Sequence, residues 1–527
     1  MFTIHTQIEQ CGEKMKYKVR DYPHIKAEVE QMSVEELLRA VICPDIRANE
    51  ELKKRTGSVF IHPTSAEEAF AASERINEDK SHPTLIASDM ENGAGFAIRG
   101  ATAFPSMRAI ALSGKSEYAY EIGVIAAKEA MNAGYHWTFA PCVDILGNVY
   151  NPPTAHRSAG NDADEVIEYC GAYMSGLQDT GLIATLKHFP GDGYSPDDQH
   201  VTVTHNPLSK EEWDESYGRI YSTLIEKGAM SIMPGHISLA AYDEPDENGI
   251  YPPASVSKRL LNDLLRTKLG FEGIIVSDAT NMSGFCGYMN LYRASCAFLE
   301  AGGDCLLFMH ESDYFHNEMK KCIEQGYLSL ETLKNRAYRM KCFAYEYFEK
   351  NPVGKKYEVD RVASDLLAKE VTQKAIRVTR DRAGLVPFDI KNETRIALIK
   401  IANPWSCDYG IPENLAKKLR NFSDTVDEYN DPGPNKLLEL AKSGDYDLMI
   451  CSVFEGPAWG INTPKLAGPA ARNMMCGWMK YNTPVIFITC NSPAFAKTYE
   501  PTVDTVIETH GHTKYTVQAL IDLIVNK

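Results

Sequence analysis

The stretch Ile183-Ala-Thr-Leu-Lys-His-Phe-Pro-Gly-Asp-Gly-Tyr-Ser-Pro-Asp-Asp-Gln-His200 shows the pattern that decides the fold. An apolar run ends in two polar residues, Lys187 and His188, and gives way to a segment rich in glycine and proline. Short apolar runs bounded by turn residues are typical of buried strands. The stretch therefore predicts a strand with polar side chains at its carboxyl end, followed by an irregular loop.

Seven other apolar runs of this kind occupy the first two-thirds of the chain, mostly separated by amphipathic segments. With the first, they lie at 40–44, 57–61, 84–89, 138–143, 183–188, 230–236, 273–278 and 305–310. Two of the intervening segments begin with capping-box sequences, Ser33-Val-Glu-Glu36 and Ser209-Lys-Glu-Glu212. Strands that alternate with helices predict a parallel sheet, and eight such units predict a closed (β/α)₈ barrel of the TIM type.

Polar and ionisable residues gather at the carboxyl ends of these runs. They are Asp89, Asp144, Lys187, His188, His236 and Asp278. In a parallel barrel these ends line one mouth, where active sites are built. A polar residue at a single strand end can simply begin a loop, but six such residues together favour a site.

A turn-rich stretch, Asn351-Pro-Val-Gly-Lys-Lys356, predicts a linker. We therefore expect a barrel over 1–350, a linker over 351–364 and a smaller doubly wound α/β sandwich domain over 365–527. In the last of these we predict a helix at 363–379 and strands at 395–401, 448–453, 485–489 and 503–507. Because this part contains neither GxGxxG nor a P-loop motif, we predict no cofactor.

Composition limits the classes of partner. The 527 residues carry a formal net charge of −16, which argues against nucleic acid or an anionic membrane as a partner. Thirteen cysteines without a CxxC pair indicate reduced thiols and a cytoplasmic protein. The N-terminus lacks the pattern of a signal peptide, and no apolar run reaches the ~18 residues of a membrane span.

The loop after Lys187 and His188 carries Asp198 and His200, one residue apart. A carboxylate at this spacing can accept a proton from one imidazole nitrogen while the other nitrogen faces a substrate, which makes a general acid/base. Taken alone, the pair also fits a solvated polar loop. The pair His510-Gly-His512 is more typical of a loop than of a metal site, so we predict no metal.

Four other residues are candidates for the site, and three of them also have a structural interpretation. Asp278 suits a nucleophile at an acetal carbon, or a helix N-cap. Asp89 can accept hydrogen bonds from sugar hydroxyls, and Arg157 can donate to an oxygen atom or pair with a loop carboxylate. His236 can line the mouth or be a satisfied core histidine.

Several of these segments, taken together, resemble glycoside hydrolase family 3 in its two-domain form, and in particular its bacterial β-N-acetylglucosaminidase branch. The matching segments are Gly100-Ala-Thr-Ala-Phe-Pro105, Phe139-Ala-Pro-Cys-Val-Asp144, His156-Arg-Ser158, Lys187-His-Phe-Pro-Gly191, Asp198-Gln-His200, Pro253-Ala-Ser-Val-Ser257, Leu269-Gly-Phe-Glu-Gly-Ile-Ile-Val-Ser-Asp278 and Ala301-Gly-Gly-Asp304. They cover most of residues 30–310 in the order of the family.

The resemblance implies a retaining exo-β-glycosidase for a small carbohydrate such as terminal β-linked N-acetylglucosamine. It makes Asp278 the nucleophile and Asp198 with His200 the acid/base. The residues that it implies for holding the sugar are Asp89, Arg157, Lys187 and His188, to which we add His236 from its strand-end position. Because the dyad supplies the acid/base, the second domain is left with a structural or rim role.

The chain departs from the branch at two places. Asp192 stands where the branch usually has histidine, and Asn92-Gly-Ala-Gly95 replaces a Gly-Gly-Arg sequence. The preference for a 2-acetamido sugar is therefore implied by the branch and by no residue of this chain.

Three alternatives remain open. The first is a phosphorylase of β-glycosides, because a neutral imidazole does not repel phosphate as a carboxylate does. The second is a barrel aldolase with Lys187 as a Schiff base. The third is a non-catalytic sugar-binding protein. Within the glycosidase interpretation itself, a β-glucosidase or β-xylosidase of the same family would also fit.

Overall fold

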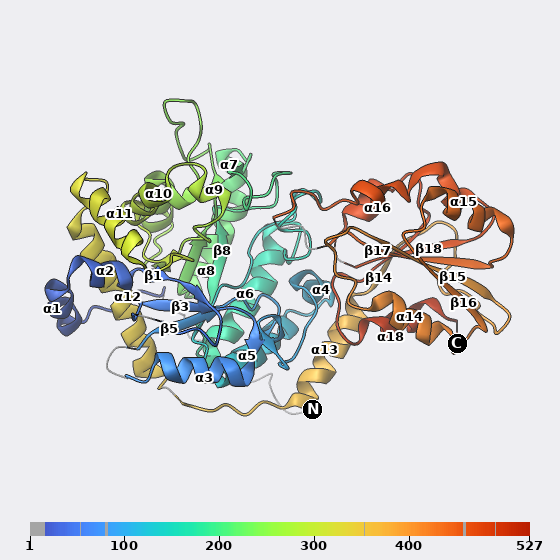
Figure 1. The fold of residues 1–527 in the computed structure, drawn as a ribbon, viewed down its shortest axis with the longest axis horizontal. Coiled ribbons are helices and arrows are strands. Elements are labelled where there is room, and N and C mark those ends of the chain that lie inside the picture. The colour runs from blue at the N-terminus through green and yellow to red at the C-terminus, as the bar shows by residue number, and fades with distance from the viewer. Residues whose placement is uncertain are drawn as a thin grey trace.

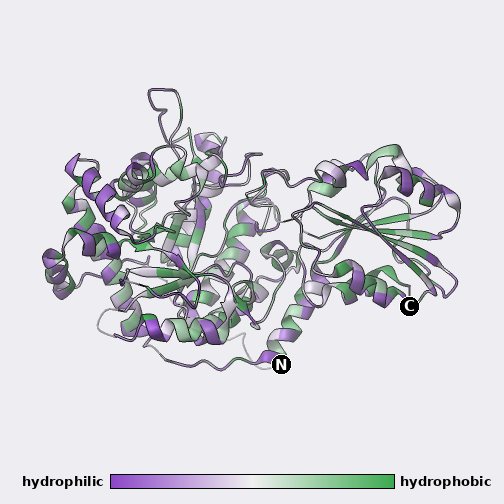
Figure 2. Ribbon diagram, in the orientation of Figure 1, coloured by the Kyte–Doolittle hydropathy of each residue, from purple (hydrophilic) through white to green (hydrophobic). Residues whose placement is uncertain are grey.

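The computed structural model describes residues 16–52, 54–79, 83–352, 354–456, 460–490 and 492–526. Figure 1 shows a larger α/β part and a smaller one, with helix α13 (Arg361–Ala375) lying between them. Hydrophobic residues are concentrated on the strands, while the helices present mixed faces (Figure 2). None of the helices in these ranges is long and apolar enough to cross a membrane.

The larger part contains parallel strands at all eight apolar runs expected from the sequence. Its main strands are β1 (Ile42–Cys43), β2 (Asp45–Ile46), β3 (Ser58–Ile61), β5 (Leu85–Ser88), β7 (Trp137–Thr138), β8 (Thr185–Phe189), β10 (Ser231–Pro234), β12 (Ile274–Ile275) and β13 (Leu306–Leu307). Short pairs are formed by β4 (Thr64–Ser65) with β6 (Ile98–Arg99) and by β9 (Thr204–His205) with β11 (Ile237–Ser238).

The main strands form three parallel sheets, in the orders β2-β3-β5-β7, β8-β10-β12 and β1-β13. Single bridges connect them: Trp137 with Ile183, Cys142 with Lys187, and Val276 with Cys305. β1 and β2 are separated by one residue, Pro44. The closed barrel expected from the sequence is thus not traced by one continuous ladder, although the parallel order of its strands is present.

The helices of the larger part surround these strands and bury their apolar faces in one core. They are α1 (Pro23–Gln31), α2 (Val34–Ala40), α3 (Ala66–Ile76), α4 (Met107–Leu112), α5 (Ser116–Asn132), α6 (Ala163–Thr180), α7 (Lys210–Trp213), α8 (Arg219–Glu226), α9 (Ser283–Cys286), α10 (Leu291–Ala301), α11 (Asp313–Glu324) and α12 (Leu330–Lys350), with 3₁₀ turns η2 (Ala94–Phe96) and η4 (Ala254–Val256) and π-helical segments η3 (Asp214–Gly218) and η5 (Arg259–Lys268). Both expected capping boxes are confirmed, at Ser33 and Ser209, and Ser65 forms a third.

The smaller part is a six-stranded sheet in the order β14-β19-β18-β17-β15-β16. All pairs are parallel except the edge pair of β14 with β19. The strands are β14 (Arg377–Asp381), β15 (Arg395–Ala402), β16 (Thr425–Asn430), β17 (Leu448–Phe454), β18 (Val485–Thr489) and β19 (Thr505–Glu508). The helices are α14 (Ile411–Leu419), α15 (Pro434–Ser443), α16 (Gly468–Arg472), α17 (Ala494–Thr498) and α18 (Thr516–Ile524), with a 3₁₀ segment η6 (Met475–Lys480). Separate apolar cores form on the two faces, which is a doubly wound arrangement.

The structure differs from the sequence analysis at three points in this region. The helix predicted at 363–379 ends at Ala375, and Arg377 begins β14, which pairs with β19. The edge strand β16 was missed because its sequence, TVDEYN, is mostly polar. In addition, α13 begins at Arg361, inside the expected linker, and its residues Leu367 and Val371 belong to the core of the larger part.

Candidate active site

The carboxyl ends of the parallel strands bring most of the expected site residues together. Lys187 and His188 lie within β8, Asp89 follows β5, and Asp278 follows β12 by three residues. Side-chain contacts join Lys187 to Asp89 and His188 to Asp278. The expectation that these strand ends share one mouth is therefore met for these residues.

A buried ion-pair network forms one side of the site. Glu91 receives two hydrogen bonds from Arg157, at 2.9 Å from Nε and 2.7 Å from Nη2, and an ion pair from Lys187 at 2.7 Å. Lys187 also contacts Asp89 at 2.9 Å. Burial opposes charge on Glu91, but Arg157 and Lys187 outweigh it and hold the pKa of this carboxyl well below its usual range. The sequence analysis did not identify Glu91, although it lies two residues after Asp89.

The contacts of Arg157 and Lys187 bear on the alternatives left open for these two cations. The guanidinium fork of Arg157 is used on Glu91, so Arg157 pairs with a loop carboxylate. Burial lowers the pKa of the Lys187 ammonium, but Asp89 and Glu91 outweigh burial and leave that pKa raised. A Schiff-base lysine must lose its proton, so this environment disfavours the aldolase alternative. Asp89 keeps a third of its side chain exposed and is available to a ligand.

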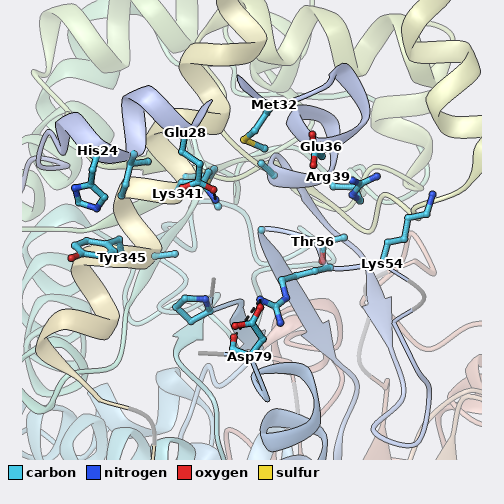
Figure 3. Close-up of a pocket in the computed structure, with 17 residues that line it drawn as sticks. His24, Glu28, Met32, Glu36, Arg39, Lys54, Thr56, Asp79, Lys341 and Tyr345 are labelled. Carbon is cyan, nitrogen blue, oxygen red and sulfur yellow. Dashed lines mark hydrogen bonds and ion pairs between the residues drawn. The ribbon is translucent and has the colours of Figure 1, made fainter. Parts of the chain in front are cut away.

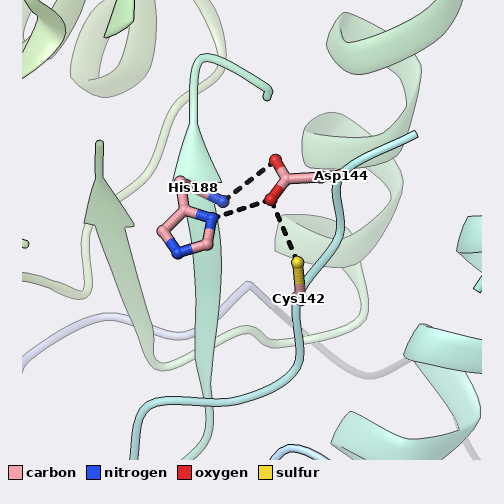
Figure 4. Close-up of side chains that lie close together, drawn as sticks. All are labelled: Cys142, Asp144 and His188. Atoms are coloured by element: carbon pink, nitrogen blue, oxygen red, sulfur yellow. Dashed lines mark hydrogen bonds and ion pairs between the residues drawn. The ribbon is translucent and has the colours of Figure 1, made fainter. Parts of the chain in front are cut away.

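His188 is oriented by a buried carboxylate (Figure 4). Its Nδ1 lies 2.7 Å from Asp144 Oδ2, and its backbone N–H donates to Asp144 Oδ1 at 3.2 Å. The Cys142 thiol donates to the same carboxylate at 3.0 Å. The three groups lie close enough to hold a metal ion, but burial and Asp144 raise the pKa of the Cys142 thiol well above its usual range. The contacts of Asp144 with Cys142 and His188 form a hydrogen-bonded triad.

The Nε2 atom of His188 lies 3.9 Å from Asp278 Oδ2, close to the expected nucleophile. Asp278 Oδ1 accepts a hydrogen bond from the Ala279 N–H at 2.8 Å, and 13% of its side chain is exposed. Burial raises the pKa of Asp278, but His188, His236 and His200 together outweigh it, so that the pKa is lowered. A carboxylate that stays ionised is what a nucleophile requires.

His236 lies below the surface of the site, where it contacts the Ala279 carbonyl next to Asp278. It is fully buried, with Nδ1 at 2.9 Å from Ser255 Oγ and Nε2 at 3.2 Å from the carbonyl oxygen of Ala279. Burial lowers its pKa to about 4. Since both nitrogens are engaged, the geometry favours the core alternative for His236 and leaves no atom for a sugar.

The expected dyad is also formed. His200 Nδ1 lies 2.5 Å from Asp198 Oδ1, which further accepts the His200 N–H at 2.9 Å. The Asp198 side chain is fully buried, whereas 28% of the His200 side chain is exposed. Burial acts to raise the pKa of Asp198, but His200 outweighs burial and the pKa is lowered. An ionised carboxylate behind a partly exposed imidazole is the arrangement of a supported acid/base.

Residues 25–342 match the glycosyl hydrolase family 3 N terminal domain. The chain belongs to glycoside hydrolase family 3. It is thus an enzyme that acts on O-glycosyl bonds, and the family resemblance seen in the sequence is confirmed.

Curated and solved relatives of this family 3 enzyme extend the comparison. It is 27% identical to the β-N-acetylglucosaminidase/β-glucosidase of Cellulomonas fimi, over 89% of this chain and 86% of that protein. A β-hexosaminidase of Glaesserella parasuis is 33% identical over 44% of this chain and 66% of its own length. Among solved structures, a β-glucoside phosphorylase, BglX, bound to 2FGlc superposes with a TM-score of 0.84 and 25% identity, covering 97% of this chain and 96% of that one.

The departures from the branch can now be placed in the family 3 site. Asp192 is buried beside the triad: its N–H donates to Asp144 Oδ1 at 2.8 Å, and its Oδ1 accepts from Asn151 at 2.7 Å. Burial, followed by the charge of Asp144, raises the pKa of Asp192 to about 6. Asn92 donates from Nδ2 to the Phe104 carbonyl at 2.8 Å, which holds the loop that replaces the Gly-Gly-Arg sequence.

Two cavities lie on opposite sides of the parallel strands. One, of about 330 Å³, is lined by Glu91 and Arg157 of the ion-pair network and by Tyr409 and His512 of the smaller part. The rings of Tyr409 and His512 are stacked, with centroids 3.5 Å apart, so His512 is part of a cavity wall.

The other cavity, of about 660 Å³, is shown in Figure 3. It lies among α1, α2 and α12 and touches Thr56 and Gly57, which precede β3. It therefore sits at the amino ends of the strands, away from the residues of the site. Its lining includes none of the candidate catalytic residues of this family 3 enzyme.

Proposed function

We propose that this enzyme is a retaining exo-β-glycosidase that removes terminal β-linked N-acetylglucosamine or a related β-hexoside. One observation carries the proposal. The His200 imidazole has its Nδ1 on the buried Asp198 carboxylate, while Asp278 is held ionised by surrounding histidines. These two groups supply the acid/base and the nucleophile of a double displacement.

In the first step, the protonated imidazole of His200 gives its Nε2 proton to the glycosidic oxygen, and Asp278 forms a bond to the anomeric carbon. The aglycone leaves as an alcohol. In the second step, neutral His200 takes a proton from water, whose oxygen displaces Asp278. Asp198 stabilises the imidazolium, as its short contact with Nδ1 supports.

The sugar is held by Asp89, Lys187 and His188 in this proposal, with Arg157 contributing by fixing Glu91 beside Lys187. Asp89 is the most exposed of the carboxylates in the network, with 33% of its side chain exposed against 11% for Glu91. An ionised carboxylate can accept hydrogen bonds from two sugar hydroxyls. The name of the Cellulomonas fimi relative supports N-acetylglucosamine and glucose as the first sugars to test.

The test is a screen of p-nitrophenyl β-glycosides of N-acetylglucosamine, glucose, xylose and galactose. Asp278→Ala should lower turnover of the preferred glycoside by at least about 10⁴-fold, because the covalent step is lost. Asp278→Asn, which keeps the shape, should be equally impaired. Activity of Asp278→Ala within a few-fold of wild type would overturn the assignment.

A second candidate, a β-glycoside phosphorylase, is favoured by the likeness to the BglX phosphorylase over nearly the whole chain. After the first step the acid/base is a neutral imidazole, which does not repel an incoming phosphate. Phosphate would then displace Asp278 and release a sugar 1-phosphate. Product analysis with and without phosphate decides: free sugar as the product under both conditions excludes this candidate.

We also propose that the barrel is closed, with the single bridges of Trp137, Cys142 and Val276 completing the ring of parallel strands. The division into a barrel and a smaller α/β domain is retained, with the boundary moved to the end of α13 at Ala375 because α13 packs in the barrel core.

A cytoplasmic location is supported by the described cysteines, which are all free thiols. Hydrogen exchange tests the closure of the barrel and the domain boundary, and cell fractionation tests the location.

A further inference from the structure

The carboxylate of Asp198 has a partner from the other part of the molecule. While Oδ1 faces His200, Oδ2 accepts a hydrogen bond of 2.5 Å from the Gly460 N–H. The Asp198 N–H in turn donates to Asn462 Oδ1 at 3.0 Å. Gly460 and Asn462 follow β17 in the smaller part, so two polar contacts of Asp198 cross between the parts.

Burial makes the Gly460 contact consequential. The Asp198 side chain is fully buried, and a buried carboxylate oxygen without a donor is costly. With both oxygens bonded, the carboxylate plane is fixed, and it directs Oδ1 at Nδ1 of His200. Fixing Nδ1 in this way leaves Nε2 as the nitrogen that exchanges protons with a substrate.

The segment 460–467, which we call the dyad-holding loop, is fixed to the smaller part by side-chain hydrogen bonds of Asn403. The side chain of Asn403, only 1% exposed, donates to the carbonyls of Glu455 and Lys465 at 3.0 Å each and accepts from the Ala467 N–H at 2.9 Å. Asn403 follows β15, which is the neighbour of β17 in the sheet. It therefore ties the end of the loop to the point where the strand order reverses.

The loop is also seated on the larger part. The Lys465 ammonium lies 3.8 Å from the centre of the Tyr150 ring, a cation–π contact. Within the loop, Gly460 has φ of 75° and Asn462 has φ of 63°. Glycine and asparagine are the residues that adopt this left-handed conformation most readily, so the sequence matches the backbone that the two contacts need.

We propose that the dyad-holding loop is a positioning element of the acid/base, with the Gly460 N–H and Asn462 Oδ1 as the groups that hold Asp198. The smaller domain is then a working part of the active site, beyond the structural or rim role implied by the family resemblance. This inference rests on the proposed role of Asp198 and His200 as acid/base. It assigns Asn462 no contact with substrate.

The test compares two aryl β-glycosides of the preferred sugar that differ in their need for an acid. A dinitrophenyl group leaves readily without a proton, whereas a phenyl group needs one. Asn462→Gly keeps the left-handed backbone and removes only the side-chain acceptor. Because one hydrogen bond is lost, we expect kcat/KM on the phenyl glycoside to fall about fivefold and that on the dinitrophenyl glycoside to stay near wild type.

Two variants serve as the positive and the negative control for Asn462→Gly. His200→Ala should show the same selectivity at full size, a loss of about 10²-fold or more on the phenyl glycoside. Thr463→Ala should match wild type on both substrates, because the Thr463 hydroxyl bonds only within the loop, accepting from the Lys465 N–H at 3.3 Å. Asn462 is exposed, so Asn462→Gly should keep the wild-type unfolding temperature.

The outcomes separate the two ideas. If His200→Ala is selective but Asn462→Gly is unchanged, or loses activity equally on both glycosides, the inference about the loop is wrong and the proposed function stands. If His200→Ala retains wild-type activity on the phenyl glycoside, the proposed acid/base is wrong. If Asn462→Gly unfolds, Asn462→Ser, which also shortens the side chain, is measured in its place with the same criteria.

Discussion

The single residue Glu91 pairs with both cations of the site, Arg157 and Lys187. Its side chain is 11% exposed, and those of Arg157 and Lys187 are 10% and 5% exposed. Removing one member of such a buried set leaves a charge without its partner, which costs more than the set gains as a whole. The network is therefore sensitive to single substitutions while its net contribution to stability stays modest.

We predict that Glu91→Gln lowers the free energy of unfolding by about 3 kcal/mol, because Arg157 loses its bidentate acceptor. Chemical denaturation of both proteins checks the value. Glu439→Gln, which removes an exposed pair with Lys436, is the control and should change stability by less than about 1 kcal/mol. Equal effects of the two substitutions would contradict the view that burial makes this network sensitive.

Asp192 gives a prediction for the pH dependence of stability. Its pKa is raised from 3.8 to about 6 in the folded protein by burial and by Asp144. Between these values the folded state binds more protons than the unfolded state, so stability falls as pH rises. The penalty reaches roughly 3 kcal/mol above pH ~6.

Asp192→Asn removes this titration. We therefore expect the variant to gain stability relative to wild type on going from about pH 4 to about pH 7, as measured by denaturation at both values. Groups that do not interact with Asp192 titrate alike in the two proteins and cancel in the difference. Burial acts to raise the pKa of Asp144, but His188 outweighs burial and leaves that pKa lowered, so Asp144 stays ionised between these two pH values. A difference that does not change with pH would show that Asp192 is not protonated more readily in the folded protein.

At the scale of elements, the loop after β17 illustrates what the sequence can and cannot predict. Strands β8 and β12 could be placed from their apolar runs, and Asp278 and the Asp198–His200 spacing followed from the ends of those runs or from the next loop. These signals are local in sequence. The contact of Gly460 with Asp198 joins positions 262 residues apart, and no local pattern marks it.

The same reasoning explains the other misses. Glu91 has no periodicity of its own, and its importance comes from Arg157, 66 residues away. The helix predicted through 379 ends early because Arg377 is taken into a strand by pairing with Glu508. His236 was left undecided between site and core, and its bonds to Ser255 and Ala279 are tertiary.

Asn403 allows a prediction about the loop as an element. Its three side-chain hydrogen bonds are lost in Asn403→Ala, and each contributes about 1 kcal/mol, so the free energy of unfolding should fall by about 2–3 kcal/mol. Released from this tie, the dyad-holding loop should also lose part of its grip on Asp198. We expect a drop of kcat/KM on the phenyl glycoside that exceeds the drop on the dinitrophenyl glycoside.

The control for this element is Asn414→Ala. Asn414 is exposed in α14 and makes one side-chain bond, to the Gly410 carbonyl at 2.8 Å. It should cost less than about 1 kcal/mol and leave both glycosides unaffected. A similar change in activity from both asparagines would contradict the role given to Asn403.

At the scale of the whole molecule, α13 couples the two parts. Its buried residues Leu367 and Val371 belong to the core of the larger part and pack near α4 and α5, while its C-terminal end leads into β14 of the second sheet. The second sheet has its own two cores, on opposite faces. The helix is thus part of one domain by packing and of the other by sequence.

This assignment predicts different outcomes for two leucine substitutions of the same chemistry. Leu367→Ala removes a side chain from the core of the larger part, and Leu415→Ala removes one from a core of the second sheet. Each should cost about 2 kcal/mol or more. A weakened core makes the elements that pack on it open more often. Hydrogen exchange should therefore rise in α4 and α5 for Leu367→Ala, and in β15 and α18 for Leu415→Ala. If Leu367→Ala instead raises exchange in the second sheet and leaves α4 and α5 protected, α13 belongs to the smaller domain, and the boundary lies near residue 365, as the sequence alone predicted.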